Sequence, residues 1–521
     1  MGLGAAMSSA EAGEKKPPDP SPASGARAHA GGLVARNTLA LVFSQFVTTP
    51  VSIVVNAVLA RSLGAADFGI IYFANTTLLV AFLFIEWGGQ LVISGEIARN
   101  RSRAGELFGA GTALRLGLTV LLLLLIPRAS GFFGYDDRVQ TVLMLSAARM
   151  GVGSIGTLCN AVFRGYEKLS WCARTAVLVN VCEAVVLVPT LLLGGRLRAA
   201  LIAQLVAACI STGVQIALLI RLHIGRPHLS RQAVVGLLRG GLGFVLLDLV
   251  LRLQPYVDAH FLARLARPET MGWYSASNRI VGALLFPATT LAYAIYPTIS
   301  RLFAHDRPSF DALVRLALRA VTIVGLCAGT GAILFAGVAV DLIYGVDRFD
   351  PATGNLRILA IYIVLVYASI VVGISIAAAN RQLPYAVAQS FCVVVALILD
   401  PILVPYFERV AGNGGLGVST SVTVAEVAMV AAGMAILPSG VVNRSLLGTG
   451  GRALAAALGM AAVGWALRSI PFLAMPLSVV TYAGLLWALG GLDHEILDLL
   501  RNVIARKRAE PPAVVQVGTV G

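Results

Sequence analysis

The stretch VLARSLGAADFGIIYFAN, residues 58–75, lies between two long apolar segments and has a second copy further along the chain. The second copy reads FLARLARPETMGWYSASN and occupies residues 261–278. A second echo supports the same relation, because LVP at residues 187–189 recurs at residues 403–405, as one loop insertion between the halves would allow. The two echoes indicate an internal duplication. At one constant offset of 203 residues, Arg61 corresponds to Arg264, Gly69 to Gly272 and Asn75 to Asn278.

The composition of the chain predicts a polytopic membrane protein. Of its 521 residues 57% are hydrophobic and 13% are charged, and the mean hydropathy is +0.83. Soluble domains carry about 25% charged residues, so this chain could not cover its surface with polar groups in water. The net charge of +14 is spread over short loops between apolar runs. That distribution argues against nucleic acid as a partner.

Apolar runs long enough to cross a bilayer, about 20 residues each, recur fourteen times along the chain. They predict an all-α membrane protein with about 14 transmembrane helices. Because six crossings is an even number, two halves of six helices would form two lobes related by a parallel repeat, with two additional C-terminal helices. The expected spans are 37–60, 69–93, 107–127, 138–163, 171–193, 199–222, 239–263, 272–299, 317–345, 354–379, 383–407, 416–438, 449–468 and 471–490.

This reading divides the chain into six parts. The N-terminal part is rich in Ala, Gly, Pro and Ser, a composition typical of disorder. The parts are a disordered cytoplasmic tail (1–32), an N-terminal six-helix lobe (33–222), a cytoplasmic interlobe linker (223–240), a C-terminal six-helix lobe (241–440), two additional helices (441–490) and a basic cytoplasmic tail (491–521).

The loops that carry the most Lys and Arg predict which side of the protein faces the cytoplasm. With the N-terminus in the cytoplasm, the cytoplasmic segments carry roughly twice as many basic residues as the opposite loops. Both termini are then cytoplasmic, and the basic segment RNVIARKR (501–508) suits anionic membrane lipids. Residues 94–109 and 300–315 mix charges with apolar residues at helical spacing. We expect each to form a helix lying in the membrane interface.

Metal, cofactor and nucleotide chemistry have little support in the sequence. The six cysteines lie singly in or beside apolar segments, without ligand spacing, so we expect neither a disulfide framework nor a metal site. No phosphate-binding GxxxxGK[ST] loop occurs. We therefore expect no cofactor, and no use of ATP by this chain itself.

Several segments in a fixed order resemble the polysaccharide transporter family. They are ARSLGAADFGIIYFAN (60–75), IEWGGQLVISGEIARNRS (85–102), FRGYEKLSWCA (163–173), LARPETMGWYSASNRI (265–280) and LDPILVPYF with GGLG (399–407 and 414–417). The family comprises oligosaccharide or O-antigen flippases. It lies within a superfamily that also holds multidrug exporters and lipid II flippases. Where relatives often carry a polar amide in the eleventh helix, this chain has Asp400.

The resemblance implies a flippase that is not an enzyme. It would move a polyprenyl-diphosphate-linked oligosaccharide, such as a repeat unit of O-antigen, capsule or exopolysaccharide, across the bacterial cytoplasmic (inner) membrane by alternating access, coupled to an ion. Polymerase and chain-length proteins of the same pathway are possible partners. The alternatives are a lipid II flippase, a cation-coupled multidrug antiporter and a membrane-embedded polysaccharide polymerase. A polymerase usually needs a large polar loop, and no loop here exceeds about twenty residues.

The cargo requires cations for its diphosphate and hydrogen-bonding groups for its sugars inside the membrane. A charge there costs about 2.5–3.5 kcal/mol on insertion scales and normally faces the bundle interior. Arg149 and Arg252 lie near the middle of the fourth and seventh spans, one in each lobe, and arginine can hold phosphate bidentately. We predict that these two arginines approach the diphosphate, although Asp248 could merely neutralise Arg252. The further substrate-binding candidates are Arg279, Arg115, Gln45 and Asn278.

Buried carboxyl groups are the candidates for ion coupling, because burial favours their protonated form. We predict that Asp248 or Glu183 is protonated in one facing state and paired with arginine in the other, with Glu86 as a further candidate. The same residues would also be present if these acids only formed permanent ion pairs with arginine and took no part in ion coupling. Asp258 and Asp400 are expected near the outer surface, where solvation would explain them.

Overall fold

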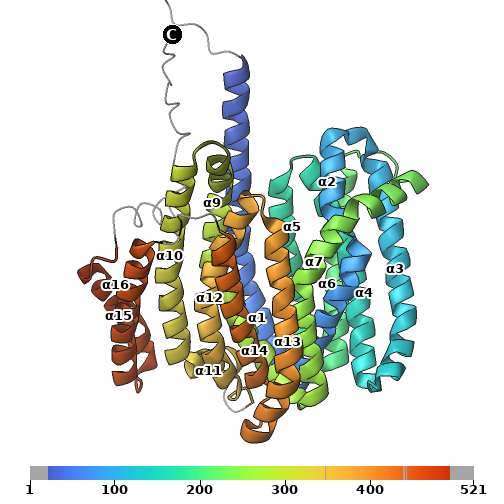
Figure 1. The fold of residues 1–521 in the computed structure, drawn as a ribbon. Coiled ribbons are helices and arrows are strands. Elements are labelled where there is room, and N and C mark those ends of the chain that lie inside the picture. The colour runs from blue at the N-terminus through green and yellow to red at the C-terminus, as the bar shows by residue number, and fades with distance from the viewer. Residues whose placement is uncertain (1–21, 88, 346–347, 438–440, 442, 493–521) are drawn as a thin grey trace, which may run out of the picture.

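A computed structural model describes residues 22–87, 89–345, 348–437, 441 and 443–492, and Figure 1 shows that this part of the chain consists of helices. The first lobe contains α1 (Pro22–Glu86), α2 (Gly89–Arg99), α3 (Ala104–Phe133), α4 (Asp137–Gly165), α5 (Leu169–Leu192) and α6 (Leu197–Ile220). The second contains α7 (Arg231–Leu265), α8 (Pro268–Leu284), α9 (Phe286–His305), α10 (Arg307–Leu334), α11 (Ala336–Tyr344), α12 (Ala352–Ala378), α13 (Gln382–Ala411) and α14 (Gly415–Ile436).

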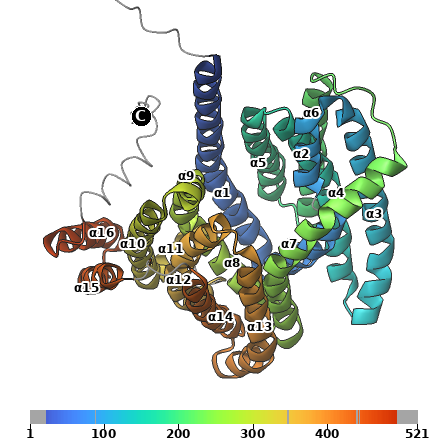
Figure 2. The same cartoon turned by 45° about the horizontal axis from the view of Figure 1, so that its top comes forward.

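Two further helices, α15 (Arg444–Ala466) and α16 (Pro471–Ala488), pack on each other and on α10, at the side of the second lobe (Figures 1 and 2). The predicted all-α architecture of two lobes and two C-terminal helices is confirmed. By length and apolar composition, the described residues contain 11 helices able to cross a membrane, or 13 if each of two bent pairs is one span. The predicted number of fourteen is compatible with this range, because α1 is broken at Gly64.

Local sequence signals explain where the helices begin and end. The side chains of Asp136, Ser230 and Asp306 accept hydrogen bonds from backbone N–H groups three residues ahead, and so cap α4, α7 and α10. The bonds from Ser309 also lower the pKa of Asp306. Gly134, in the left-handed conformation at φ 69°, ends α3. Outward-facing leucines such as Leu121 and Leu124 leave α3 an exposed apolar surface, as a helix facing lipid requires.

The breaks in the helices define two ends of the bundle. We call the end that carries Gly64 and the α3–α4 and α5–α6 loops the Gly64 end, and the opposite end, with Asn100 and Asp306, the Asn100 end. Gly64 has φ 81° and ψ 172°, a backbone conformation open chiefly to glycine, and it separates the first two spans. The bent pairs are the two parts of α7, which meet at 41°, and α8 with α9, which meet at 42°.

The two lobes meet where the duplicated glycines face each other. A Cβ atom on Gly69 would lie 2.7 Å from the backbone nitrogen of Gly272 and equally close to the carbonyl oxygen of Pro268. A Cβ atom on Gly272 would overlap the carbonyl of Ala65. The backbones of α1 and α8 can therefore touch because neither position carries a side chain. The repeat thus predicted two equivalent glycines, and the fold brings them together.

Three expectations from the sequence need correction. The chain is helical from Pro22, so residues 22–32 of the expected disordered tail (1–32) belong to α1, and the rest of that tail lies outside the described residues. The expected linker (223–240) is half helical, because α7 begins at Arg231 and its Leu238 carbonyl accepts a hydrogen bond from Trp87. The two expected interface helices are instead capped breaks between helices at Asn100 and Asp306. The basic tail (491–521) lies almost wholly outside the described residues.

The glycine contact predicts a selective effect of a small side chain. Gly272→Val should lower the free energy of unfolding by about 1–3 kcal/mol, because the new side chain must push α8 away from α1. The matched control is Gly282→Val in the same helix, where a Cβ atom would meet nothing within 4 Å. Thermal unfolding of the purified variants, followed by tryptophan fluorescence, measures the difference. Equal melting temperatures for the two variants would contradict this account of the contact.

Candidate functional site

Arg149 lies in the interior of α4 and is oriented by the first copy of the repeated motif. Its Nη2 donates a 2.8 Å hydrogen bond to Oδ1 of Asn75, in the part of α1 that follows Gly64. Its Nε is buried and has no hydrogen-bond partner among the described residues. Asn75 therefore holds the guanidinium in place and leaves donor capacity for a ligand.

Arg279 lies opposite, on α8 of the second lobe. The residue is exposed although its neighbours Ser277 and Ile280 are buried. Its guanidinium carbon lies 5.8 Å from the centre of the Phe68 ring on the first lobe. The charge of Arg279 interacts with those of Arg149 and Glu183. The two lobes therefore each contribute one arginine to a shared site.

Glu183 on α5 is the acidic member of this site. Its Oε1 accepts a 3.0 Å hydrogen bond from Nε2 of Gln204 on α6, and its charge also interacts with that of Arg149. Two guanidinium groups and one carboxylate leave an excess of one positive charge. We call Arg149, Arg279 and Glu183 the interlobe arginine site. An anion that enters between the lobes would meet two forked donors.

Arg252, predicted to approach the diphosphate together with Arg149, pairs with Asp248, the alternative that the sequence also offered. Its Nε and Nη2 both lie 2.9 Å from Oδ2 of Asp248, one turn earlier on α7. Both side chains are partly exposed. The structure instead brings Arg149 near Arg279, which is the cross-lobe pair that the sequence could not single out.

Arg115 and Glu86 belong to a network inside the first lobe. Arg115 is 2% exposed, and its Nη1 donates to Oγ1 of Thr157 at 2.8 Å and to the carbonyl of Ser154. The Thr157 hydroxyl donates in turn to Oε1 of Glu86 at 2.9 Å. This network joins α1, α3 and α4. Of the two predicted amides, Gln45 is exposed on α1 and Asn278 is half-buried beside Arg279.

Asp258 on α7 and Asp400 on α13 form a buried pair, so the expectation that solvation explains them is wrong. Their exposed fractions are 3% and 0%. The two side chains interact directly, and the oxygens Oδ1 of Asp258 and both of Asp400 find no donor among the described residues. A carboxylate oxygen can only accept a hydrogen bond, so the pair needs one shared proton or a bound cation.

The carboxyl pair lies beside the contact between the lobes. The charge of Asp258 interacts with Tyr72 of the first lobe and with Tyr274 of the second, and the centres of these two rings are 6.0 Å apart. Ser421 on α14 lies next to Asp400. Among the described residues no group of three or more His, Cys, Asp or Glu side chains could hold a metal ion.

At the Gly64 end, two arginines related by the repeat join the lobes. Arg61 donates from Nη2 to the carbonyl of Leu342 at 2.6 Å and from Nε to that of Ile343 at 3.0 Å, at the end of α11. Arg264 donates from Nη2 to the carbonyl of Phe133 at 2.6 Å, at the end of α3. The last carbonyls of a helix lack intrahelical donors and bear partial negative charge, so arginine suits them.

We call Arg61 and Arg264 the cross-lobe arginines. Each leaves the end of the first span of its own lobe and binds the end of the third span of the other. Together with the Gly69–Gly272 contact, they hold the lobes together at the Gly64 end.

The cross-lobe arginines predict a measurable separation of the lobes. Arg61→Ala/Arg264→Ala should shift the distance between spin labels on Leu193 and Val410 towards longer values, because three hydrogen bonds between the lobes are lost. Both labelled positions are exposed, one in each lobe. Double electron–electron resonance spectroscopy measures the distribution of distances between the two labels. The protein is in nanodiscs and lacks its native cysteines.

The matched control is Arg128→Ala/Arg409→Ala. These two arginines bond only to carbonyls four residues earlier in their own helices. Unchanged distances in the first variant, or an equal shift in the control, would refute a role in holding the lobes together.

Comparison with known proteins places this geometry in a family. Over 326 residues the chain is 23% identical to the "Putative O-antigen transporter" of Escherichia coli (strain K12), covering 61% of this chain and 77% of that protein. The fold is similar to the inward closed conformation of the lipid II flippase MurJ, with a TM-score of 0.70 and 12% identity over 86% of this chain and 98% of that one. It is also similar to an inward-facing multidrug resistance MATE family transporter of the MOP superfamily, with a TM-score of 0.62 and 15% identity over 77% of this chain and 97% of that one. The family model described as "Polysaccharide biosynthesis protein" matches residues 34–303, a little over half of the chain, and the chain belongs to that family.

Proposed function

We propose that the protein is a flippase that moves a polyprenyl-diphosphate-linked oligosaccharide across the bacterial cytoplasmic membrane. The observation that carries this proposal is the interlobe arginine site, in which Arg149 of one lobe and Arg279 of the other lie close enough for their charges to interact. The saccharide would be a repeat unit of O-antigen, capsule or exopolysaccharide. Flipping breaks no bond, so the protein acts as a transporter and not as an enzyme.

The charge of the site suits a diphosphate. Arginine keeps its charge inside a membrane and offers parallel N–H donors to two phosphate oxygens. Arg149 has a buried Nε without a protein acceptor, so it has a donor to offer. A cationic drug would meet repulsion from the two guanidinium groups, which disfavours the multidrug alternative. A lipid II flippase would share the diphosphate, and the family membership favours a polysaccharide precursor.

The orientation follows from the basic loops. We infer that the Gly64 end faces outward and that both termini lie in the cytoplasm, because the Asn100 end carries more Lys and Arg. The cross-lobe arginines then close the outer end in this conformation. Rocking of the lobes would break those bonds and open the arginine site outward. Anionic membrane lipids would bind the basic inner segments, and polymerase and chain-length proteins of the pathway would receive the cargo outside.

We propose that Asp258 and Asp400 couple transport to protons, in addition to the predicted candidates Asp248, Glu183 and Glu86. In the present conformation the buried pair would hold one proton between two carboxyl groups. Separation of Tyr72 from Tyr274 on lobe movement would let water reach the pair, and the proton would leave. By comparison, Asp248 is already neutralised by Arg252 and is partly exposed.

The arginine site predicts the phenotype of its variants. Arg149→Ala or Arg279→Ala, expressed in a strain that lacks the chromosomal gene, should reduce surface polymer at least about tenfold, since one charged hydrogen bond to phosphate is worth about 1.5–3 kcal/mol. Lipid-linked repeat units should accumulate on the cytoplasmic face. Arg149→Lys should retain partial export, because lysine keeps the positive charge but lacks the parallel N–H donors of the guanidinium group.

The control for this experiment is Arg409→Ala, which removes an exposed arginine that bonds only to its own helix. Protein abundance in the membrane is measured for every variant by immunoblotting. Normal polymer export by Arg149→Ala and Arg279→Ala would remove the basis of the proposed function.

The carboxyl pair predicts which substitutions uncouple transport. In proteoliposomes, a proton gradient should accelerate flipping by the wild-type protein. Asp258→Asn/Asp400→Asn should abolish that acceleration, because the amides cannot exchange a proton. Asp248→Asn should keep it. Acceleration that survives in the double variant but disappears in Asp248→Asn or Glu183→Gln would instead favour the acids predicted from the sequence.

A further inference from the structure

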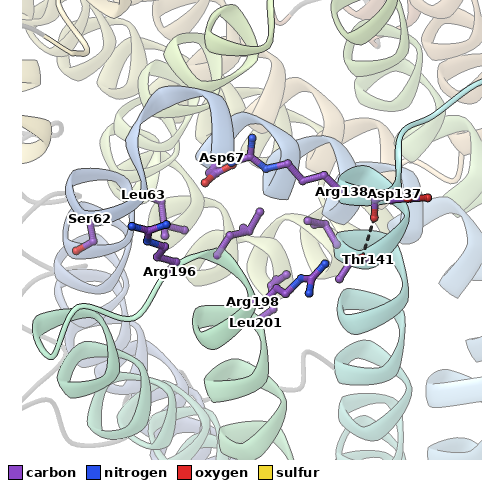
Figure 3. A pocket seen from close by; sticks show the side chains of 11 residues that line it. Ser62, Leu63, Asp67, Asp137, Arg138, Thr141, Arg196, Arg198 and Leu201 are labelled. Atoms are coloured by element: carbon purple, nitrogen blue, oxygen red, sulfur yellow. Dashed lines mark hydrogen bonds and ion pairs between the residues drawn. The ribbon is translucent and has the colours of Figure 1, made fainter.

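A cavity of about 700 Å³ lies at the Gly64 end of the first lobe, apart from the interlobe arginine site. Figure 3 shows side chains from three places around it: the loop at Gly64, the start of α4 and the start of α6. Its size falls in the range of small-molecule sites, about 300–1,000 Å³. Its charged residues are Asp67, Asp137, Arg138, Arg196 and Arg198.

The cavity carries more positive than negative charge. Arg138 forms an ion pair with Asp67. Arg196 and Arg198 are exposed and make no hydrogen bond or ion pair with any described residue. Three arginines against two aspartates leave one positive charge in excess. That excess matches a ligand with a single carboxylate better than a diphosphate.

A helix N-terminus adds partial positive charge to the cavity. α6 begins at Leu197, so its positive end is at the cavity, whereas the start of α4 is capped by Asp136. Arg196 stands at the N-cap position of α6 and makes no side-chain hydrogen bond to its first turn. The first N–H groups of α6 therefore lack a side-chain cap and remain available to an anion.

The second lobe provides an internal comparison, because there the corresponding place is filled. Arg267 occupies the position that corresponds to Gly64, and its Nε lies 2.8 Å from Oε1 of Glu408. Oε2 of Glu408 accepts bonds from Oγ1 of Thr270 at 3.2 Å and from the N–H of Gly414 at 2.7 Å. Thr270 corresponds to Asp67. Arg267 also donates to the carbonyl of Gly412.

The first lobe thus has a glycine where the second has an arginine, and two free arginines where the second has a glycine-rich loop. The duplicated fold does not require Arg196 and Arg198, since the second lobe closes the same place without them. Their presence against the usual shortage of basic residues on the outer side calls for a ligand.

The other lining residues suit a sugar. Leu63 is partly exposed and supplies apolar surface, whereas Val142, Leu197 and Leu201 are buried beneath the cavity. Ser62 supplies a hydroxyl group, and the hydroxyl of Thr141, which donates to the carbonyl of Asp137, can still accept a hydrogen bond. We propose that this cavity binds an acidic sugar of the cargo, with its carboxylate paired with Arg196, whose guanidinium group lies towards Leu63 in Figure 3, or with Arg198, whose group points towards α4. The proposal rests on the proposed function, since it takes the cargo to be a saccharide and the Gly64 end to face outward.

A matched pair of disaccharides tests this site. Cellobiouronic acid and cellobiose differ only in one carboxylate in place of a hydroxymethyl group. Isothermal titration with the full-length protein in phosphatidylcholine nanodiscs should show binding of the acid about tenfold tighter than of the neutral sugar, because its charged hydrogen bonds are the stronger ones. Arg196→Gln/Arg198→Gln should bind both equally weakly. Arg196→Lys/Arg198→Lys and the control Arg409→Gln should keep the preference.

Three results would overturn the site. They are equal binding of the two sugars by the wild-type protein, a preference that persists in the glutamine variant, and displacement of the acid by inorganic phosphate at equal concentration, which would leave an adventitious anion only. Loss of binding in nanodiscs that also contain phosphatidylglycerol would assign the cavity to a lipid headgroup and likewise refute it. The titration requires no transport. A protein that keeps its preference for the acid but exports no polymer would refute the proposed function alone.

Discussion

A charged side chain at the depth of the hydrocarbon costs about 2.5–3.5 kcal/mol on insertion scales, and this cost decides where the chain places its arginines and carboxylates. The structure meets it in two ways. Asp248 and Arg252 neutralise each other on one helix, and Arg115 reaches Glu86 through Thr157 inside the first lobe. Arg149 and Arg279, from different lobes, have one carboxylate, Glu183, within range of their charges, which leaves an excess of positive charge between the lobes. That excess is why the account assigns them an anionic cargo.

The duplicated segments supply both the close backbone contact between the lobes and the hydrogen bonds that hold the lobes together. Gly69 and Gly272 allow the backbones of the two halves to touch, and the cross-lobe arginines bind carbonyls of the opposite lobe. Because the same element appears twice, each lobe holds the other by the same chemistry. The cavity at the Gly64 end is the exception, since Gly64 forms the break in α1 of the first lobe whereas Arg267, at the corresponding position of the second lobe, is paired with Glu408. The contacts between the lobes are therefore symmetric, and the cavity that we propose as a ligand site lies where the symmetry is lost.

The sequence predicted the helical architecture well because its signals are local. Apolar runs locate most spans within a few residues, although α1, α7 and α10 begin 15, 8 and 10 residues earlier than predicted. The constant offset identified the repeat before any contact was known. The contacts between distant residues could not be predicted. Asp258 and Asp400 are 142 residues apart, and nothing in either apolar segment indicates that α7 packs on α13. In the same way, the sequence offered four arginines for the site, and only the fold paired Arg149 with Arg279.

The most direct test of the central claim is the binding of a diphosphate-linked lipid to the purified protein. Native mass spectrometry can compare a polyprenyl-diphosphate disaccharide with a neutral polyprenyl glycoside, for the wild-type protein and for Arg149→Met/Arg279→Met. If Arg149 and Arg279 hold the diphosphate, the wild-type protein should bind the diphosphate lipid far more tightly than the neutral one, and the methionine variant should bind both equally. Retention of the diphosphate preference by the methionine variant would contradict the account.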